Sequence, residues 1–238
     1  GLQMGILFNQ GQVCCAGSRV FVQESIYDRF VEEAVKRFNK VKVGLPWKEE
    51  TQMGSQIDRR QMEKILKYVE IGKEEGAKVL CGGVQAKEGE LEKGCFLRPT
   101  LLGDVTNDMR VAQEEIFGPV LPIVTYDSLD HAIAKINSMP HPLALYLFTS
   151  DQKIAKKVTA RCSFGGGCIN DVVIHLATSE MGFGGFGESG MGAYHGKNGF
   201  DTFSHYKSIV DKRTWLDLPM RYQPYKKTNE TLLRFFLK

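Results

Sequence analysis

The sequence predicts an α/β fold in which a mostly parallel sheet is flanked by helices. Short apolar segments of strand type alternate along the chain with amphipathic segments of helical period. This alternation is typical of parallel sheets with crossover helices. The chain has 238 residues, of which 42% are hydrophobic. That is enough for a substantial core, in one large domain or in one domain with appendages.

The first elements of the chain are a strand and two amphipathic helices. Residues 18–23 alternate between apolar and polar side chains, which predicts a strand. Ser25 is expected to cap the next helix, because a serine side chain accepts hydrogen bonds from free helix amides. A second helix is expected from about Arg59 to Glu75, and Gly76 marks its end. The apolar stripe of the first helix consists of Ile26, Phe30, Val31, Ala34, Val35 and Phe38.

The same alternation continues through the middle of the chain. Helices are expected to begin at Ser128 and at Asp151, each between two apolar segments. The Gly-rich residues 181–192 indicate a loop. The expected strands lie within residues 78–83, 94–102, 120–126, 143–150 and 165–171.

The end of the chain has a different character. Residues 201–210 predict a late, exposed strand, and residues 231–238 a short amphipathic turn. We therefore expect a domain over residues 1–201, followed by a strand and basic tail over residues 202–238. An exposed strand edge requires a pairing partner.

Charge and cysteine content exclude several classes of protein. The net charge is +3, too small to indicate a nucleic-acid-binding protein. Residues 213–238 carry six Lys or Arg and two Asp or Glu, so the excess of positive charge lies in the tail. The six cysteines form no Cys-x-x-Cys pair, which favours free thiols in a reducing compartment. No apolar run is long enough to span a membrane, and no metal site is expected.

Residues 8–18, with the sequence FNQGQVCCAGS, carry the most informative feature. A thiol is nucleophilic as a thiolate, which nearby backbone amides or a base stabilise. Gly11 permits close backbone approach, and the small residues after the cysteines leave room for a flat carbonyl substrate. The amide of Cys14 would then face a developing oxyanion. Two buried structural cysteines are the alternative interpretation.

Three motifs in one order resemble the aldehyde dehydrogenase superfamily: FNQGQVCCAGSR at 8–19, QEEIFGPVLPIV at 113–124 and FGGFGESGMG at 183–192. The resemblance implies that Cys14 is the catalytic nucleophile. It covers about residues 1–210, and residues 113–207 are most similar to the class 3 branch. It implies a mostly parallel catalytic-domain sheet and a C-terminal oligomerisation strand.

The resemblance also assigns roles to individual residues. It implies that Glu115 holds the nicotinamide ribose and that Phe117 lies beside the nicotinamide. It places Gln61 and Lys64 near the cofactor ribose, and Val13, Cys15 and Phe183 along the substrate tunnel. Gly182 stands where the family usually has proline, so the loop before Phe183 is expected to be looser. From the residues alone, the two phenylalanines indicate core aromatics, and Gln61, Lys64 and Glu115 indicate solvated positions.

The implied reaction is oxidation of an aldehyde to a carboxylic acid with NAD or NADP, through a thiohemiacetal and a thioester on Cys14. The family is about twice as long as this chain, and no dinucleotide-binding Gly motif occurs here. We therefore expect the NAD-binding half to be absent and the isolated chain to lack turnover. An acylating relative that uses CoA or phosphate, and a non-catalytic assembly domain, remain alternatives.

The resemblance also implies partners. We expect a small aldehyde as substrate and a homo-oligomer, dimer or tetramer, for the intact enzyme. A cytoplasmic location is consistent with free thiols. The basic tail suggests at most a weak contact with an anionic membrane surface. The sequence does not identify the aldehyde, and it does not separate NAD from NADP.

Overall fold

The computed structural model describes residues 1–218, 221–224 and 227–236. The chain divides into two compact units, Gly1–Phe203 and Ser204–Lys238. The boundary lies two residues after the one expected from the sequence. The functional naming of the two parts stays a prediction.

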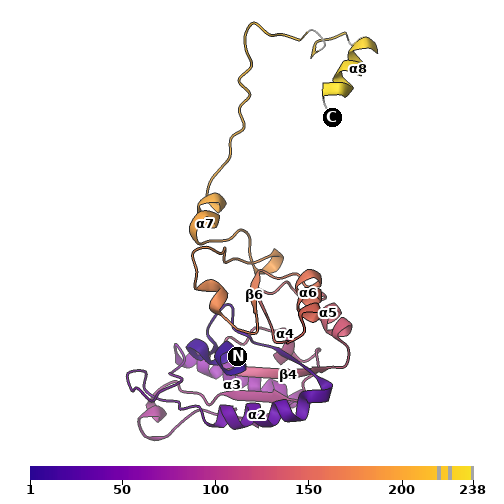
Figure 1. Cartoon of the computed structure of the whole chain (residues 1–238). Coiled ribbons are helices and arrows are strands. Elements are labelled where there is room, and N and C mark those ends of the chain that lie inside the picture. Colours follow the sequence, from indigo (N-terminus) through magenta and orange to yellow (C-terminus); the bar gives the residue numbers. More distant parts are fainter. Residues whose placement is uncertain (219–220, 225–226, 237–238) are drawn as a thin grey trace. The chain divides into compact units, whose positions relative to one another are not determined.

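The first unit contains a four-stranded mixed sheet in the order β1-β4-β3-β2. Strand β4 of this sheet is labelled in Figure 1. Strand β4 is parallel to both β1 and β3, whereas β2 is antiparallel to β3. A second sheet pairs β5 with β6 in parallel. The predicted α/β class is confirmed, although one antiparallel pairing makes the main sheet mixed. The strands are β1 Val20–Gln23, β2 Lys78–Cys81, β3 Thr100–Gly103, β4 Val120–Tyr126, β5 Ala144–Leu147 and β6 Gly166–Ile169.

Two hydrophobic clusters cover the two faces of the main sheet. Successive residues of a strand point to opposite faces, and Leu101 and Leu102 of β3 accordingly enter different clusters. Leu101 packs with residues of helices α1 (Leu2–Leu7) and α2 (Tyr27–Asn39). Leu102 packs with residues of α3 (Arg59–Glu74), on the other face. The sheet is therefore the middle layer of three.

The beginnings of the two long helices differ in their capping. Helix α3 begins as predicted at Arg59, and the Asp58 carboxylate accepts a hydrogen bond from the amide of Gln61 at 2.7 Å. Helix α2 begins at Tyr27 without a side-chain cap. The prediction that Ser25 caps it is wrong, because residues 24–26 form a separate 3₁₀ turn, η2 (Glu24–Ile26).

Shorter elements complete the first unit. The α-helices are α4 Arg110–Gln113, α5 Leu129–Asn137, α6 Gln152–Arg161 and α7 Gly196–Thr202. The 3₁₀ turns are η1 Phe8–Gly11, η3 Gly89–Lys93, η4 Ile174–Leu176 and η5 Gly187–Ser189.

The predicted late strand over residues 201–210 is wrong for the single chain. Its first two residues belong to helix α7, and residues 204–210 form no regular element. A strand is defined by ladder hydrogen bonds to a neighbouring strand, and residues 204–210 belong to no strand or bridge in the part of the chain that the structure describes. The expected pairing with another subunit stays a prediction.

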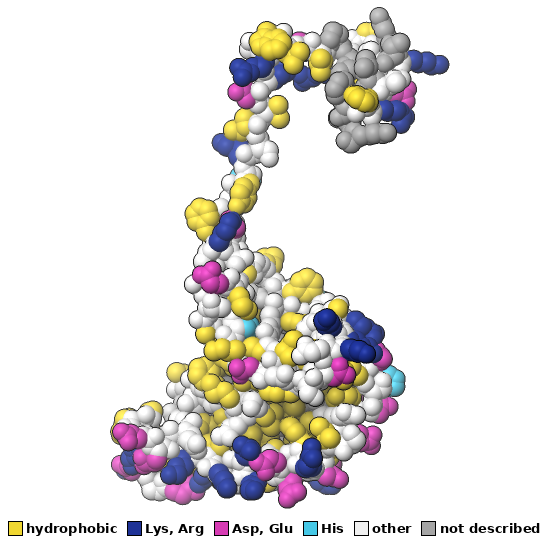
Figure 2. Space-filling model, in the orientation of Figure 1, with side chains coloured by type: hydrophobic (Ala, Val, Ile, Leu, Met, Phe, Trp, Pro, Cys, Tyr) yellow, Lys and Arg dark blue, Asp and Glu magenta, His cyan; other side chains and the backbone are white. Residues whose placement is uncertain are grey.

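Among its described residues, the second unit contains helix α8 (Lys227–Phe236), which is longer than the predicted final turn. Two residues of that predicted turn, 237 and 238, lie outside the described residues. Apolar side chains along the preceding segment are exposed, among them Ile209 and Trp215, and Figure 2 shows them interspersed with basic side chains. No described helix is both long and apolar enough to cross a membrane.

Candidate active site

The two adjacent cysteines lie at the centre of a tight turn, after the 3₁₀ turn η1. The amide of Ala16 donates to the carbonyl of Val13 at 3.1 Å, which closes a β-turn around Cys14 and Cys15. Cys14 is exposed and Cys15 is only 1% exposed. Both are free thiols. Burial raises the pKa of the Cys15 thiol. Of the two, only Cys14 is available to a substrate.

A left-handed backbone segment delivers this turn to its place. Asn9, Gln10 and Gly11 have φ angles of 46°, 57° and 73°. A Cβ atom on Gly11 would lie 2.3 Å from the carbonyl carbon and oxygen of Gly118. Glycine is therefore required at this position for two reasons, the positive φ and the close backbone approach. The backbone that leads into the cysteine turn therefore packs directly against the loop around Gly118.

Cys14 and that loop share a small pocket of about 30 Å³. Among the predicted site residues, the pocket brings together Val13, Cys14, Glu115 and Phe117. Phe117 has a φ of 59°, which is unusual for a residue other than glycine. A cysteine, a glutamate and a phenylalanine thus line one depression, from segments about 100 residues apart in the sequence.

The adjacent carboxylates Glu114 and Glu115 have different environments. Glu114 accepts a hydrogen bond from the Tyr68 hydroxyl at 2.6 Å and two from the Arg110 guanidinium at 2.8 and 3.1 Å. The Arg110 guanidinium, with Tyr68, lowers the pKa of Glu114 to about 2. The exposed carboxylate of Glu115 makes no hydrogen bond or ion pair with any residue that the structure describes. Only Glu115 is free to accept bonds from a ligand.

Helix α3 supports the backbone of this loop. The side-chain amide of Gln61 donates to the carbonyls of Phe117, at 2.7 Å, and of Ile116, at 3.2 Å. The Lys64 ammonium donates to the carbonyl of Glu115 at 3.2 Å. Both side chains therefore hold main-chain atoms of the pocket. Their expected contact with a cofactor stays a prediction.

Phe183 lies in a cluster behind the cysteine turn and does not line the Cys14 pocket. It is 7% exposed and clusters with Cys15, Val172 and Val173, against which Val13 is partly buried. The structure therefore brings Val13, Cys15 and Phe183 together as packed residues. Their roles along a substrate tunnel stay predictions.

Sequence reasoning missed Tyr146, a residue of β5. Its hydroxyl donates to the carbonyl of Cys15 at 2.7 Å. The two residues are 131 positions apart, and a tyrosine in a predicted strand carries no signal of such a contact.

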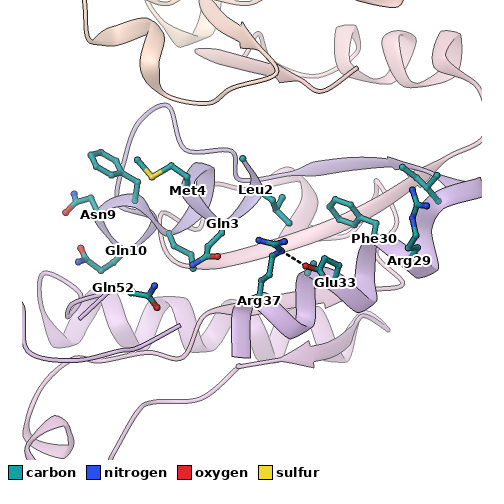
Figure 3. Close-up of a pocket in the computed structure, with 15 residues that line it drawn as sticks. Leu2, Gln3, Met4, Asn9, Gln10, Arg29, Phe30, Glu33, Arg37 and Gln52 are labelled. Atoms are coloured by element: carbon teal, nitrogen blue, oxygen red, sulfur yellow. Dashed lines mark hydrogen bonds and ion pairs between the residues drawn. The ribbon is translucent and has the colours of Figure 1, made fainter. Parts of the chain in front are cut away.

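A much larger cavity, of about 1020 Å³, lies between α1 and α2 (Figure 3). Its wall includes the ion pair of Arg37 with Glu33, at 2.6 Å, and the apolar side chains of Met4 and Phe30. None of the predicted site residues lines it. Size alone therefore does not identify the reactive site here, because the cavity holds no nucleophilic side chain. The described residues also contain no group of three or more His, Cys, Asp or Glu placed to hold a metal ion.

The fold and the site together define a class of protein. An exposed cysteine on a fixed turn, next to a small pocket on an α/β scaffold, suits covalent chemistry on a flat electrophile. The chain belongs to the aldehyde dehydrogenase family, whose family model matches residues 1–209.

Curated relatives share about two fifths of the matched residues. The chain is 39% identical over 232 residues to the 4,4'-diaponeurosporen-aldehyde dehydrogenase of Staphylococcus aureus, a match that covers 98% of this chain and 49% of the relative. It is 41% identical over 207 residues to the human mitochondrial aldehyde dehydrogenase, covering 87% of this chain and 39% of the relative. The chain thus spans about half or less of the length of these relatives.

Solved structures agree with the sequence comparisons. The NAD+ complex of the Bacillus cereus aldehyde dehydrogenase superposes with a TM-score of 0.82 at 39% identity, over 88% of this chain and 41% of that one. A betaine aldehyde dehydrogenase of Staphylococcus aureus, in complex with NAD+, superposes with a TM-score of 0.84 at 33% identity, over 92% of this chain and 44% of that one.

Proposed function

We propose that this chain is the cysteine-bearing catalytic half of an NAD(P)-dependent aldehyde dehydrogenase, with Cys14 as nucleophile. The observation that carries the proposal is the shared pocket, in which the exposed Cys14 thiol adjoins Glu115 and Phe117. Family membership and the NAD+ complexes of relatives support the reaction class. The substrate would be a small aldehyde.

In the proposed reaction, Cys14 supplies the attacking sulfur and a hydrogen-bond donor, and a cofactor and an acyl acceptor supply the remaining steps. The Cys14 sulfur forms a bond to the aldehyde carbon, and the resulting oxyanion accepts a hydrogen bond from the Cys14 amide. A nicotinamide held near Glu115 would supply the hydride acceptor, so that the acyl group would remain on Cys14 as a thioester. Water then adds to the thioester carbon, the bond from that carbon to Sγ breaks, and the carboxylic acid leaves while the thiol is restored. Sulfur suits both halves, because it is nucleophilic and is also a good leaving group.

The residues of this chain fit the ribose end of such a cofactor. The Glu115 carboxylate has no competing partner among the described residues, and a carboxylate accepts hydrogen bonds from ribose hydroxyls. Lys64 binds the carbonyl of Glu115 itself, and Gln61 binds the carbonyls of the next two residues, Ile116 and Phe117. We propose that the part of the relatives' length that this chain does not span supplies the main nucleotide-binding surface.

Protection of Cys14 by an aldehyde tests the proposal on the chain itself. An aldehyde reversibly converts the thiol into a thiohemiacetal, so it should slow the alkylation of Cys14 by iodoacetamide. The matched primary alcohol should not, and alkylation of Cys168 serves as the internal control. Equal alkylation rates of Cys14 with and without aldehyde would remove the basis of the proposal.

An assay of steady-state turnover by the isolated chain tests whether the proposed nucleotide-binding surface outside this chain is required. We expect no NADH production from 238 residues with aldehyde and NAD, because the proposed nucleotide platform lies elsewhere. The measurement is absorbance at the NADH wavelength over time, with a full-length relative as the positive control. Sustained NADH production by this chain would show that the platform is not required.

The remaining partners are also proposals. We propose that the intact enzyme is a cytoplasmic homo-oligomer, in which residues 204–210 pair with a neighbouring subunit. The exposed apolar side chains of this segment, Ile209 and Val210 among them, support a partner. Any contact of the basic tail with an anionic membrane would be weak, because its net charge is modest.

A further inference from the structure

The Tyr146 side chain of the second sheet reaches the cysteine turn. Tyr146 lies in β5, in register with Cys168 of β6. Its hydroxyl donates a hydrogen bond of 2.7 Å to the carbonyl oxygen of Cys15, the residue after the proposed nucleophile. The bond therefore links the two-stranded sheet to the turn that carries Cys14.

The surroundings of Tyr146 keep this bond in place. The ring contacts the imidazole of His175 edge-on, with centroids 5.8 Å apart. On another side the ring lies close enough to Gly17 that a Cβ atom there would be 3.7 Å from Cδ2 of Tyr146. Burial raises the pKa of the Tyr146 phenol, so the hydroxyl stays protonated and remains a donor at neutral pH.

Cys15 is held on both its side chain and its carbonyl, and Cys14 is not. The Cys15 side chain is packed against Val172 and Val173, while its carbonyl accepts the tyrosine bond. The amide of Cys14 donates to no acceptor within the described residues. The peptide unit of the Cys15 carbonyl also carries the Ala16 amide, which donates to the Val13 carbonyl. The Val13 carbonyl lies in the same peptide unit as the Cys14 amide. The direction of the Cys14 amide therefore depends on how firmly the Cys15–Ala16 peptide unit is fixed.

We propose that Tyr146 is a positioning residue for Cys14. By holding the carbonyl of Cys15, it orients the turn so that the amide and the thiol of Cys14 face the same reacting carbonyl group. This inference rests on the proposed function, because it assigns a task to Tyr146 in acyl transfer at Cys14. Tyr146 itself touches neither substrate nor cofactor in this account.

Two reagents separate positioning from general stability. Iodoacetamide alkylates a thiolate without forming an oxyanion, so its rate depends little on the Cys14 amide. p-Nitrophenyl acetate acylates the thiol: a bond forms between Sγ and the acetyl carbon, nitrophenolate leaves with its electron pair, and the thiol proton passes to water. That reaction proceeds through an oxyanion that needs the aligned amide.

The decisive variant is Tyr146→Phe, which keeps the ring and removes the hydroxyl. We expect acylation of Cys14 to slow about tenfold, while alkylation of Cys14 changes less than about twofold. The matched control is Tyr126→Phe at the end of β4, a half-buried tyrosine whose hydroxyl bonds to no described residue. It should alter neither rate. If Tyr146→Phe does not fold, Tyr146→Met fills the space without a donor.

The possible results separate the positioning role of Tyr146 from the role of Cys14 as nucleophile. An unchanged acylation rate in Tyr146→Phe overturns the positioning role. Equal slowing of both reactions, together with a lower melting temperature, also overturns it and leaves Tyr146 as a packing residue. Acylation of the unmodified chain mainly at cysteines other than Cys14 contradicts the proposed function itself, and the role of Tyr146 with it.

Discussion

At the scale of residues, the site contains two pairs of identical adjacent residues, two cysteines and two glutamates. The members of each pair differ in their exposure or in their hydrogen bonds. Cys14 is exposed while Cys15 is buried, and Glu115 has no partner among the described residues while Glu114 is bound to Arg110 and Tyr68. Cys15 belongs to the buried cluster with Val172 and Val173, whereas Cys14 lines the small pocket. The Glu114 carboxylate is occupied by hydrogen bonds from Tyr68 and Arg110, so the Glu115 carboxylate is the one available to a ligand.

The Glu114 contacts predict a defined dependence of stability on acid. The pKa of Glu114 is lowered from 4.5 to about 2 in the folded chain. The ionised group therefore stabilises the fold above pH 4.5, and that contribution is lost as the pH falls towards 2. Glu114→Gln should melt below the unmodified chain at pH 7, and the difference should vanish near pH 2.

Thermal unfolding at a series of pH values measures this difference. Glu63→Gln is the matched control, because the exposed Glu63 on α3 makes no hydrogen bond or ion pair with any described residue. A difference between Glu114→Gln and the unmodified chain that stayed constant from pH 7 to pH 2 would exclude the carboxylate as its cause.

At the scale of elements, the pocket is assembled by a close contact between two loops. Gly11 approaches the carbonyl of Gly118, and a Cβ atom on Gly118 would lie 2.4 Å from Ile65 of α3. The cysteine turn, the Glu115 loop and α3 are therefore stacked without room for further atoms. This stacking makes the glycines structural requirements of the site.

Substitution of Gly11 tests that stacking. Gly11→Ala introduces both a positive φ of 73° for alanine and an overlap with Gly118, so we expect the free energy of unfolding to fall by roughly 3 kcal/mol or more. Gly89→Ala is the control, because Gly89 has a φ of 56° but open space around its Cβ position. It should cost only about 1 kcal/mol. Urea unfolding compares the two variants, and equal losses would argue against the close contact.

Much of this element structure could be predicted from the sequence, because local signals carry it. The apolar stripe of α2, the start of α3 at Arg59 and the short apolar segments of β3 and β4 are all properties of neighbouring residues. The late strand over 201–210 failed because a strand depends on a partner. Tyr146 was missed for a similar reason: its contact joins residues 131 positions apart. The nucleophile candidate was accessible to sequence reasoning, whereas the residues that orient it were not.

At the scale of the whole molecule, the first unit contains its own cores. The hydrophobic clusters of described residues all lie before Phe203, the end of this unit. We expect a chain truncated after Phe203 to unfold in one cooperative transition, with a free energy changed by less than about 1 kcal/mol. Chemical denaturation followed by fluorescence and circular dichroism measures both quantities. A non-cooperative transition would show that residues 204–238 are needed to fold the first unit.

Of the six sulfurs, the one that we propose for catalysis is also the one that lines the small pocket. All six cysteines lie in described residues, and Cys14 alone is exposed. Burial raises the pKa of Cys15, Cys81 and Cys162, so these thiols should react slowly at neutral pH. Limited alkylation with iodoacetamide, mapped by mass spectrometry, compares the six thiols. We expect Cys14 to be modified first and nearly alone. Modification of Cys81, Cys95 or Cys168 at the same rate as Cys14 would contradict this expectation.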